Sequence, residues 1–221
     1  MMAKIYSAAR RAVRTGALPG GGATELLRLL ECVRTSHVGL PSAALPTVTA
    51  SGRVAYQHVI ETPGEVAIGI FLLPPFATIP LHDHPQMSVL SRVLAGSLRV
   101  RSFDWAEAGG SASIVVGERR RAFLLDDDLV EGPVTRVLHP EKAGNVHAFA
   151  AGEDGCTILD VIAPPYDHVP GSRSCHYYVE EAEELGAATT PTPTAVWLRC
   201  IDEPDDFWVE GEPYRGEGVD V

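Results

Sequence analysis

The chain has 221 residues, a formal net charge of −11 and 45% hydrophobic residues, which is ordinary for a globular protein with one substantial core and excludes wholesale disorder. Asp and Glu number 29 against 18 Lys and Arg, so the acidic surface disfavours binding to nucleic-acid phosphates. No segment approaches the roughly 20 consecutive apolar residues that span a bilayer. We expect a monomer that binds neither nucleic acids nor membranes.

The four cysteines show no CxxC pair and no regular spacing, so the sequence predicts neither a zinc ribbon nor a disulfide framework. They are Cys32, Cys156, Cys175 and Cys200. Reduced thiols favour a cytoplasmic location, with the nucleus also open. Arg10, Arg11 and Arg14 give an Arg-rich, acid-poor start that leaves mitochondrial targeting open, although an amphipathic surface helix fits them better.

The first part of the chain predicts two helices, over residues 3–14 and 24–34, with glycines between them. Thr24 is expected to cap the second helix. We expect residues 1–45 to form a helical appendage packed on a main domain of residues 46–221.

From residue 41 onward, short runs of β-branched and aromatic residues alternate with Pro and Gly turns, which predicts strands. The expected strands cover residues 54–60, 66–73, 88–94, 97–103, 134–139, 147–150, 157–162 and 174–180. This spacing favours an all-β sandwich or barrel. Leu98 and Val100 should face one side of their strand while Arg99 and Arg101 face the other.

Residues 109–132 carry three successive arginines from Arg119 and three successive aspartates from Asp126. Such charge runs usually lie in water, so we expect a long surface loop here. A lid facing a substrate is the second interpretation.

His82 and His84 are separated by one residue, in the sequence PLHDHP. Residues two apart on a strand project from the same face, so the two imidazoles should point into one cavity while Asp83 points away. A third histidine, His147, follows much later. The three histidines predict a metal site.

From His82 onward the sequence reads His-x-His, then four residues, then the single position 89, then six residues, and then Gly96. This spacing resembles the first motif of the cupin superfamily, whose members are jelly-roll barrels. The position before the six-residue spacer usually holds a metal-binding glutamate in that motif, and here it is Val89.

His147 falls where the second cupin motif has its histidine, with Gly144 three residues earlier. Phe76 stands where the first motif begins with glycine, and Lys142 where the second has proline. Both departures fall in turns, so they concern local backbone geometry rather than the metal ligands.

Three neutral imidazoles bind zinc, copper, iron or nickel, so the ligands alone do not identify the metal. The familiar non-haem iron oxygenase site has two histidines and a carboxylate. A third neutral ligand leaves the site more positive, which favours an anionic thiolate from the substrate. Oxidation of a thiol to a sulfinic acid uses all the electrons that one dioxygen molecule accepts, so no other reductant is needed. A three-histidine zinc hydratase or hydrolase stays open at this point.

Four longer motifs carry a more specific resemblance. They are PLHDHP at residues 80–85, LDVIAPPYD at 159–167, CHYY at 175–178 and DDFWVEGEPY at 205–214. With them the chain resembles the family of 2-aminoethanethiol dioxygenase and plant cysteine oxidase, and it leans toward the animal type.

The resemblance implies a cupin enzyme with one Fe(II) per chain, held by His82, His84 and His147. It implies that both atoms of dioxygen are added to a thiol to give a sulfinic acid. The implied substrates are 2-aminoethanethiol, which gives hypotaurine, and the N-terminal cysteine of proteins, which gives an oxygen-dependent degradation signal. Both carry a free amine two carbons from the thiol.

Further residues match the family position by position. Asp160 matches an acidic residue near the iron, expected to orient a ligand or to receive the substrate ammonium through water; a purely structural partner is the alternative. Tyr166 matches a pocket tyrosine whose hydroxyl could bind substrate or oxygen, or pin a loop. Cys175 and Tyr177 match a pair that can be covalently linked in animal members. Gln86 replaces a glycine that is common after the histidine motif.

Two other classes of function stay open from the sequence. A zinc-dependent cupin hydrolase or isomerase would use the same three histidines without oxygen. A non-catalytic cupin would bind a ligand or partner and turn over no thiol. The remaining histidines, His176 among them, are expected to be surface or structural residues.

Overall fold

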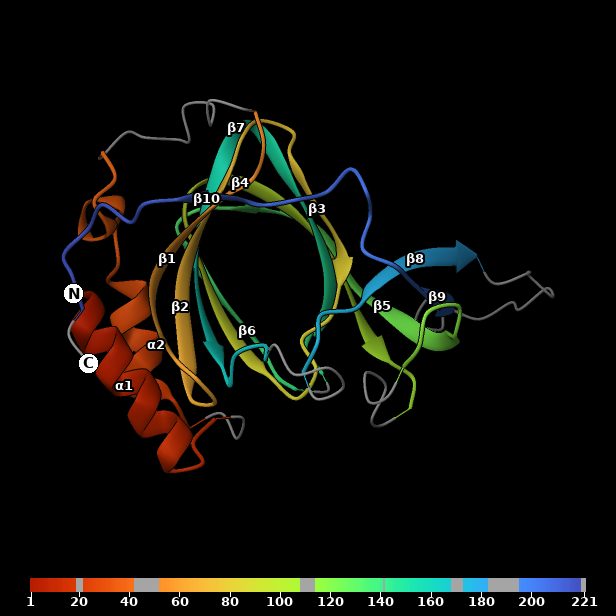
Figure 1. Ribbon diagram of the computed structural model, residues 1–221, viewed down its shortest axis with the longest axis horizontal. Coiled ribbons are helices and arrows are strands. Elements are labelled where there is room, and N and C mark those ends of the chain that lie inside the picture. Colours follow the sequence, from red (N-terminus) through yellow and green to blue (C-terminus); the bar gives the residue numbers. More distant parts are fainter. Residues whose placement is uncertain are drawn as a thin grey trace.

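The computed structural model of the protein describes residues 1–18, 22–41, 52–107, 114–140, 142–167, 173–182 and 195–219 (Figure 1). Two helices open the chain, α1 (Met2–Arg14) and α2 (Thr24–Glu31), followed by a short 3-10 helix, η1 (Thr35–Val38). The strands are β1 (Ala55–Thr62), β2 (Val66–Leu73), β3 (Thr78–His82), β4 (Ser88–Trp105), β5 (Arg119–Glu131), β6 (Val134–Leu138), β7 (Val146–Ala163), β8 (Tyr177–Ala182), β9 (Ala195–Ile201) and β10 (Glu210–Glu212).

The strands of the described residues form one sheet in the order β10-β1-β2-β7-β3-β8-β9-β5-β4-β6. An additional pairing of β7 with β4 closes this sheet into a barrel. Figure 1 shows the strands wrapped around a central space, with α1 and α2 lying outside, beside β1 and β2. The all-β barrel expected from the sequence is therefore confirmed.

The two longest strands, β4 and β7, each join two segments that we expected to be separate strands. They pair along most of their length, with register shifts between Val93 and Ala95 and between Gly96 and Leu98. Gly96 has φ +79°, and a Cβ there would lie 2.0 Å from the carbonyl oxygen of Gly155. Only glycine fits this close approach of the two strands, which explains its place in the motif.

Alternate residues of β4 and β7 face the two sides of the barrel wall. The expected alternation is confirmed, since Leu98 and Val100 are buried inside while Arg99 and Arg101 point outward and bind Asp127. On the outer side, an apolar cluster joins the helices to the strands. It contains Ile5, Ala9, Leu26, Leu30, Leu90, Leu159 and Val161.

The helices cover this outer apolar face because each has one buried stripe. Helix α1 agrees with the expected bounds. Arg11 and Arg14 lie in its last turn, where positive charges interact favourably with the negative end of the helix dipole. Helix α2 ends at Glu31, before the expected residue 34. Thr24 is its first residue rather than its cap, because Ala23 occupies that position and makes no side-chain hydrogen bond. The expected domain boundary at residue 45 lies outside the described residues.

The prediction of a loop over residues 109–132 is wrong for most of that segment, because residues 119–131 form β5. This strand pairs with β4 on one side and with β9 on the other. Its charges are matched across the strands, as in the Arg101 to Asp127 pair. Strands β3, β9 and β10 were also missing from the predicted set of strands.

Two of the departures from the family motifs fall where the backbone is left-handed. Phe76 has φ +62° and Gln86 has φ +60°, the region that favours glycine. These side chains replace glycine at positions whose backbone still needs that conformation. Among the described residues, no helix is long and apolar enough to cross a membrane.

Candidate metal centre

Three histidine side chains meet where β3 runs beside β7. His82 is the last residue of β3 and pairs in register with His147 on β7, while His84 lies in the turn two residues further on. Their ligand nitrogens lie within 4.8 Å of one another, and all three side chains are buried. The cluster found among the described residues contains no carboxylate. The three histidines are therefore brought together as predicted, although His84 arrives from a turn rather than by strand alternation.

Backbone carbonyls fix the tautomers of two of these histidines. Nδ1 of His82 lies 2.8 Å from the carbonyl oxygen of Pro80, and Nδ1 of His147 lies 3.2 Å from that of Gly144. A carbonyl oxygen only accepts hydrogen bonds, so each Nδ1 carries the proton. The Nε2 lone pair of both rings is left free to bind a metal.

Tyr166 fixes the tautomer of the third ring. Its hydroxyl donates to the backbone carbonyl of Asp83 at 2.6 Å and lies 2.7 Å from Nδ1 of His84. Because the hydroxyl proton is already used, the hydroxyl oxygen accepts a proton from Nδ1 of His84. All three rings thus carry their protons on Nδ1 and hold Nε2 for a ligand, the arrangement that metal-binding histidines adopt.

The Nε2 atoms of His84 and His147 are only 3.3 Å apart. Two lone pairs at this distance repel each other unless a cation lies between them, and nitrogens bound to one metal at about 2.1 Å have this separation. Burial lowers the pKa of all three imidazoles, and the charge of Arg136 lowers that of His147 further. Neutral rings are the form that binds metals, so the site fits a divalent metal ion.

Val89, which stands in place of the usual glutamate, lies in an apolar cluster with Met87 and Leu138. Tyr166 packs against the same cluster, and Tyr166 contacts His84. The position that supplies a carboxylate in related motifs is therefore part of an apolar wall next to the histidines. This supports a site with three neutral ligands.

Asn145 ties the two histidine segments together. Its side-chain oxygen accepts the backbone N–H of His84 at 3.2 Å, and its amide nitrogen donates to the carbonyls of His84 at 3.0 Å and His139 at 2.9 Å. Asn145 was not among the predicted site residues, although it lies two residues before His147.

Asp83 points away from the three rings, as expected, but it is fully buried and anchors the other side of the turn. Its carboxylate accepts hydrogen bonds from Tyr178 Oη at 2.6 Å and from the backbone N–H of His176 at 2.9 Å. The His176 ring is 3.1 Å from the same carboxylate, which agrees with its expected structural role. The role of Asp83 was not predicted because its partners, Tyr178 on β8 and His176 just before β8, lie more than ninety residues later in the chain.

Cys175 lies beside Tyr166 and Tyr177, and Tyr177 pairs in register with His82. Burial raises the pKa of the Cys175 thiol to about 12, although hydrogen bonds with Tyr166 and Tyr177 oppose this change. The rings of Tyr177 and His82 have centroids 6.5 Å apart. The thiol and the phenol are thus neighbours, and a covalent link between them stays a prediction.

Asp160 lies on β7, opposite Gly69 of β2 and Ser91 of β4. It is 6% exposed, and burial raises its pKa to about 6 while Ser91 acts in the other direction. Among the described residues, one carboxylate oxygen of Asp160 has no hydrogen-bond partner. The hydrogen bonds found among the described residues join Asp160 to none of the three histidines, so its role near the metal stays a prediction.

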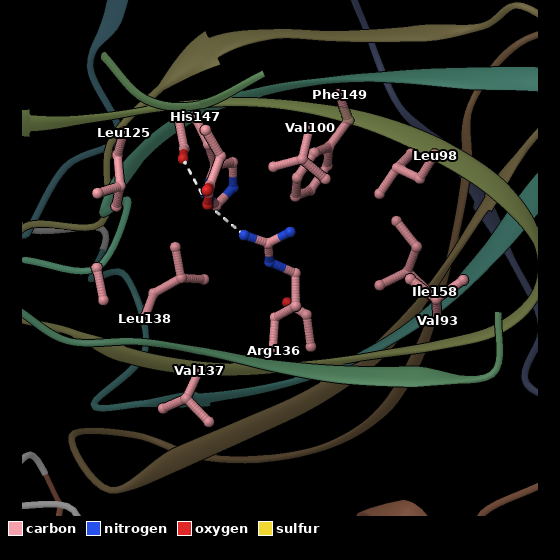
Figure 2. A pocket seen from close by; sticks show the side chains of 14 residues that line it. Val93, Leu98, Val100, Leu125, Arg136, Val137, Leu138, His147, Phe149 and Ile158 are labelled. Atoms are coloured by element: carbon pink, nitrogen blue, oxygen red, sulfur yellow. Dashed lines mark hydrogen bonds and ion pairs between the residues drawn. The ribbon is translucent and has the colours of Figure 1, made fainter. Parts of the chain in front are cut away.

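A cavity of about 210 Å³ adjoins His147 (Figure 2). Figure 2 shows Arg136 extending into the middle of this space, with Val93, Leu98 and Ile158 on the side away from His147. The cavity gives the metal centre a mainly apolar chamber in which a small group could lie.

A closed β-barrel with three converging, buried histidines defines the class of a metal-binding cupin. The family model described as PCO_ADO matches residues 29–219, and the chain belongs to this family. The family expected from the sequence motifs is therefore confirmed.

Three relatives show the extent of the similarity. Human 2-aminoethanethiol dioxygenase is 36% identical over 193 residues, which cover 75% of this chain and 68% of the relative. The mouse protein of the same name is 34% identical, with coverage of 91% and 88%. Plant cysteine oxidase 2 from Arabidopsis thaliana is 32% identical, with coverage of 93% and 77%.

Two solved structures show a weaker similarity. KdgF from Halomonas sp. has a TM-score of 0.38 and 16% identity, and the match covers 54% of this chain and 84% of that chain. A protein from Klebsiella pneumoniae with a double-stranded β-helix domain has a TM-score of 0.39 and 14% identity, with coverage of 61% and 88%. The barrel itself is established by the strand pairing described above.

Proposed function

We propose that this protein is a non-haem Fe(II) thiol dioxygenase that converts an aminothiol to its sulfinic acid. The observation that carries this proposal is the set of three Nε2 atoms that converge without a carboxylate, in a chain of the PCO_ADO family. Its relatives are named for 2-aminoethanethiol and for cysteine, which share a thiol and an amine.

His82, His84 and His147 would hold one Fe(II) per chain. Bound Fe(II) would bring the thiolate and dioxygen together, and sulfur would supply the four electrons that dioxygen accepts, so both oxygen atoms end on sulfur. The protein itself supplies a site of three neutral ligands, which favours an anionic thiolate. The apolar wall around Val89 excludes water from the reacting groups.

Tyr166 and Asp160 are proposed to support the reaction from two sides. Tyr166 holds the His84 ring through its hydroxyl, and the rest of its ring borders the apolar cluster. Asp160 supplies a buried carboxyl group inside the barrel, for a ligand or an ammonium reached through water. We propose a monomer that acts in the cytoplasm or nucleus, with residues 1–45 as the appendage and 46–221 as the catalytic domain.

The test uses iron-loaded protein with 2-aminoethanethiol and with a peptide that begins with cysteine. The expected result is a mass gain of two oxygen atoms per thiol, with one dioxygen consumed for each product. A peptide that begins Met-Cys is the control, because it has no free amine next to the cysteine, and it should not react.

A zinc-loaded sample and an anaerobic sample separate the alternatives. A zinc hydrolase or isomerase would be active with zinc and indifferent to oxygen, and a binding protein would turn over no thiol with either metal. Either result would overturn the proposed function.

A further inference from the structure

The cavity beside His147 has a polar end that the proposed metal centre does not use. Asp126 of β5 and Arg136 of β6 line it and form an ion pair there. Ser102 of β4 donates its hydroxyl to the Asp126 carboxylate at 3.4 Å. Figure 2 shows the Arg136 guanidinium in the open space of the cavity, with a dashed line to its partner. The ion pair is therefore accessible to a ligand that enters the cavity.

Strand register places this ion pair close to the histidines. Asp126 pairs with Ser102, and Ser102 pairs with His147, so the three residues lie in one row across β5, β4 and β7. Neighbouring strands are about 4.8 Å apart, so Asp126 lies about 10 Å from His147 along this row. A thiol held at the histidines and the Asp126 carboxylate would therefore border the same cavity.

The Ser91 hydroxyl lines the same cavity. Ser91 pairs in register with Arg136 and is 7% exposed. It also lies opposite Asp160 and lowers the pKa of that carboxyl group. The polar part of the cavity thus offers a carboxylate and a guanidinium, with a hydroxyl in the same wall.

These groups match the first residue of a peptide better than they match 2-aminoethanethiol. A carboxylate binds an ammonium group, and a guanidinium donates to a carbonyl oxygen. An N-terminal cysteine carries both partners, whereas 2-aminoethanethiol carries the ammonium group alone.

We propose that Asp126 and Arg136 form the recognition site for an N-terminal cysteine, an inference that rests on the proposed function. Asp126 binds its free amine directly, which leaves Asp160 the other of its two proposed roles, to orient a ligand. Arg136 binds its first carbonyl oxygen. The amine contact serves both substrates, while the carbonyl contact selects a peptide or protein over the small aminothiol.

The test measures kcat/KM of iron-loaded variants for 2-aminoethanethiol and for a peptide that begins with cysteine. Arg136→Met should lower kcat/KM for the peptide about 10- to 100-fold and change that for 2-aminoethanethiol less than about threefold, because a charged hydrogen bond contributes about 1.5–3 kcal/mol. Asp126→Asn should lower both values by a similar factor. Anaerobic calorimetry with the same two ligands should show the same pattern in Kd, without turnover.

The matched controls are Asp127→Asn and Arg99→Met, which belong to an ion pair between β5 and β4 on the outer face of the barrel. Both controls should keep the wild-type values for both substrates. Because each single cavity variant leaves a charge unpaired, the double variant Asp126→Asn/Arg136→Met is also measured. It should bind iron and unfold at a temperature close to that of the wild type while it loses the preference for the peptide.

Three results would overturn this inference while the proposed function stands. They are an equal loss for both substrates in Arg136→Met, a wild-type kcat/KM in Asp126→Asn, and a selective loss of amine binding in Asp160→Asn instead. If the wild-type protein oxidised neither substrate, the proposed function itself would fail, and the recognition site with it.

Discussion

The hydroxyl of Tyr166 lies 2.7 Å from Nδ1 of His84 and is held there by its own hydrogen bond to the backbone carbonyl of Asp83. A residue 82 positions away in the chain thereby sets the orientation and tautomer of one proposed metal ligand. Groups that orient a ligand ring commonly change metal affinity by 10- to 100-fold when removed.

Tyr166→Phe should therefore lower the affinity for iron about 10- to 100-fold, because His84 loses the acceptor for its Nδ1 proton. The measurement is competition with a chelator of known affinity. Tyr214→Phe is the control, because the Tyr214 hydroxyl is buried and has no hydrogen-bond partner in the part of the chain that the structure describes. Equal affinities in the two variants would show that the hydroxyl does not support the ligand.

His147→Ala should abolish iron binding and turnover, because two imidazoles alone leave the site one ligand short. Iron content by elemental analysis and oxygen uptake with 2-aminoethanethiol check this expectation. His58 is exposed on β1, so His58→Ala should bind iron as the wild type does. Normal activity of His147→Ala would remove the central proposal.

Asp83→Asn should destabilise the protein by about 2–4 kcal/mol, because Tyr178 and His176 lose a buried charged acceptor. Unfolding in urea measures this change. Asp127→Asn, which breaks a partly exposed ion pair, should cost about 1 kcal/mol or less. A similar small cost for Asp83→Asn would mean that its network does not hold the turn.

The sequence predicted the barrel and the three histidines well because both depend on local patterns. Alternation such as that of Leu98 and Arg99 shows directly which residues face the core. The motif spacing selected His147 more than sixty residues from His82 without any knowledge of the strand pairing.

The missed features depend on pairing between distant strands. Asp126 and Asp127 occur in a charge run that is typical of a loop, yet one lines the cavity and the other faces Arg99 on the outside. Cross-strand arginines satisfy both charges, and no local pattern contains those partners. Asp83 was set aside for the same reason, since Tyr178 reaches it from β8.

Asp160→Asn should retain iron and lose turnover, because the amide keeps the shape of the side chain but cannot carry its charge or release its proton. Iron content and kcat for 2-aminoethanethiol check this expectation together. Unchanged kinetics would leave Asp160 with a structural role only.

Asp160 should also make folding stability depend on pH in a way that Asn does not. Burial raises its pKa from 3.8 to about 6, so the folded protein favours the protonated carboxyl group. Below about pH 4 the group is protonated in both the folded and unfolded states. As the pH rises to about 6 the unfolded state releases its proton first, and the free energy of unfolding falls by about 3 kcal/mol.

The difference in unfolding free energy between Asp160→Asn and wild type should therefore grow from pH 4 to pH 6 and stay constant above that range. Urea unfolding at several pH values measures this difference, with Asp154→Asn as a control on the exposed part of the same strand. The control should show no such change, because the Asp154 side chain is exposed to water. A pH-independent difference for Asp160→Asn would mean that the buried carboxyl group keeps its ordinary pKa in the folded protein.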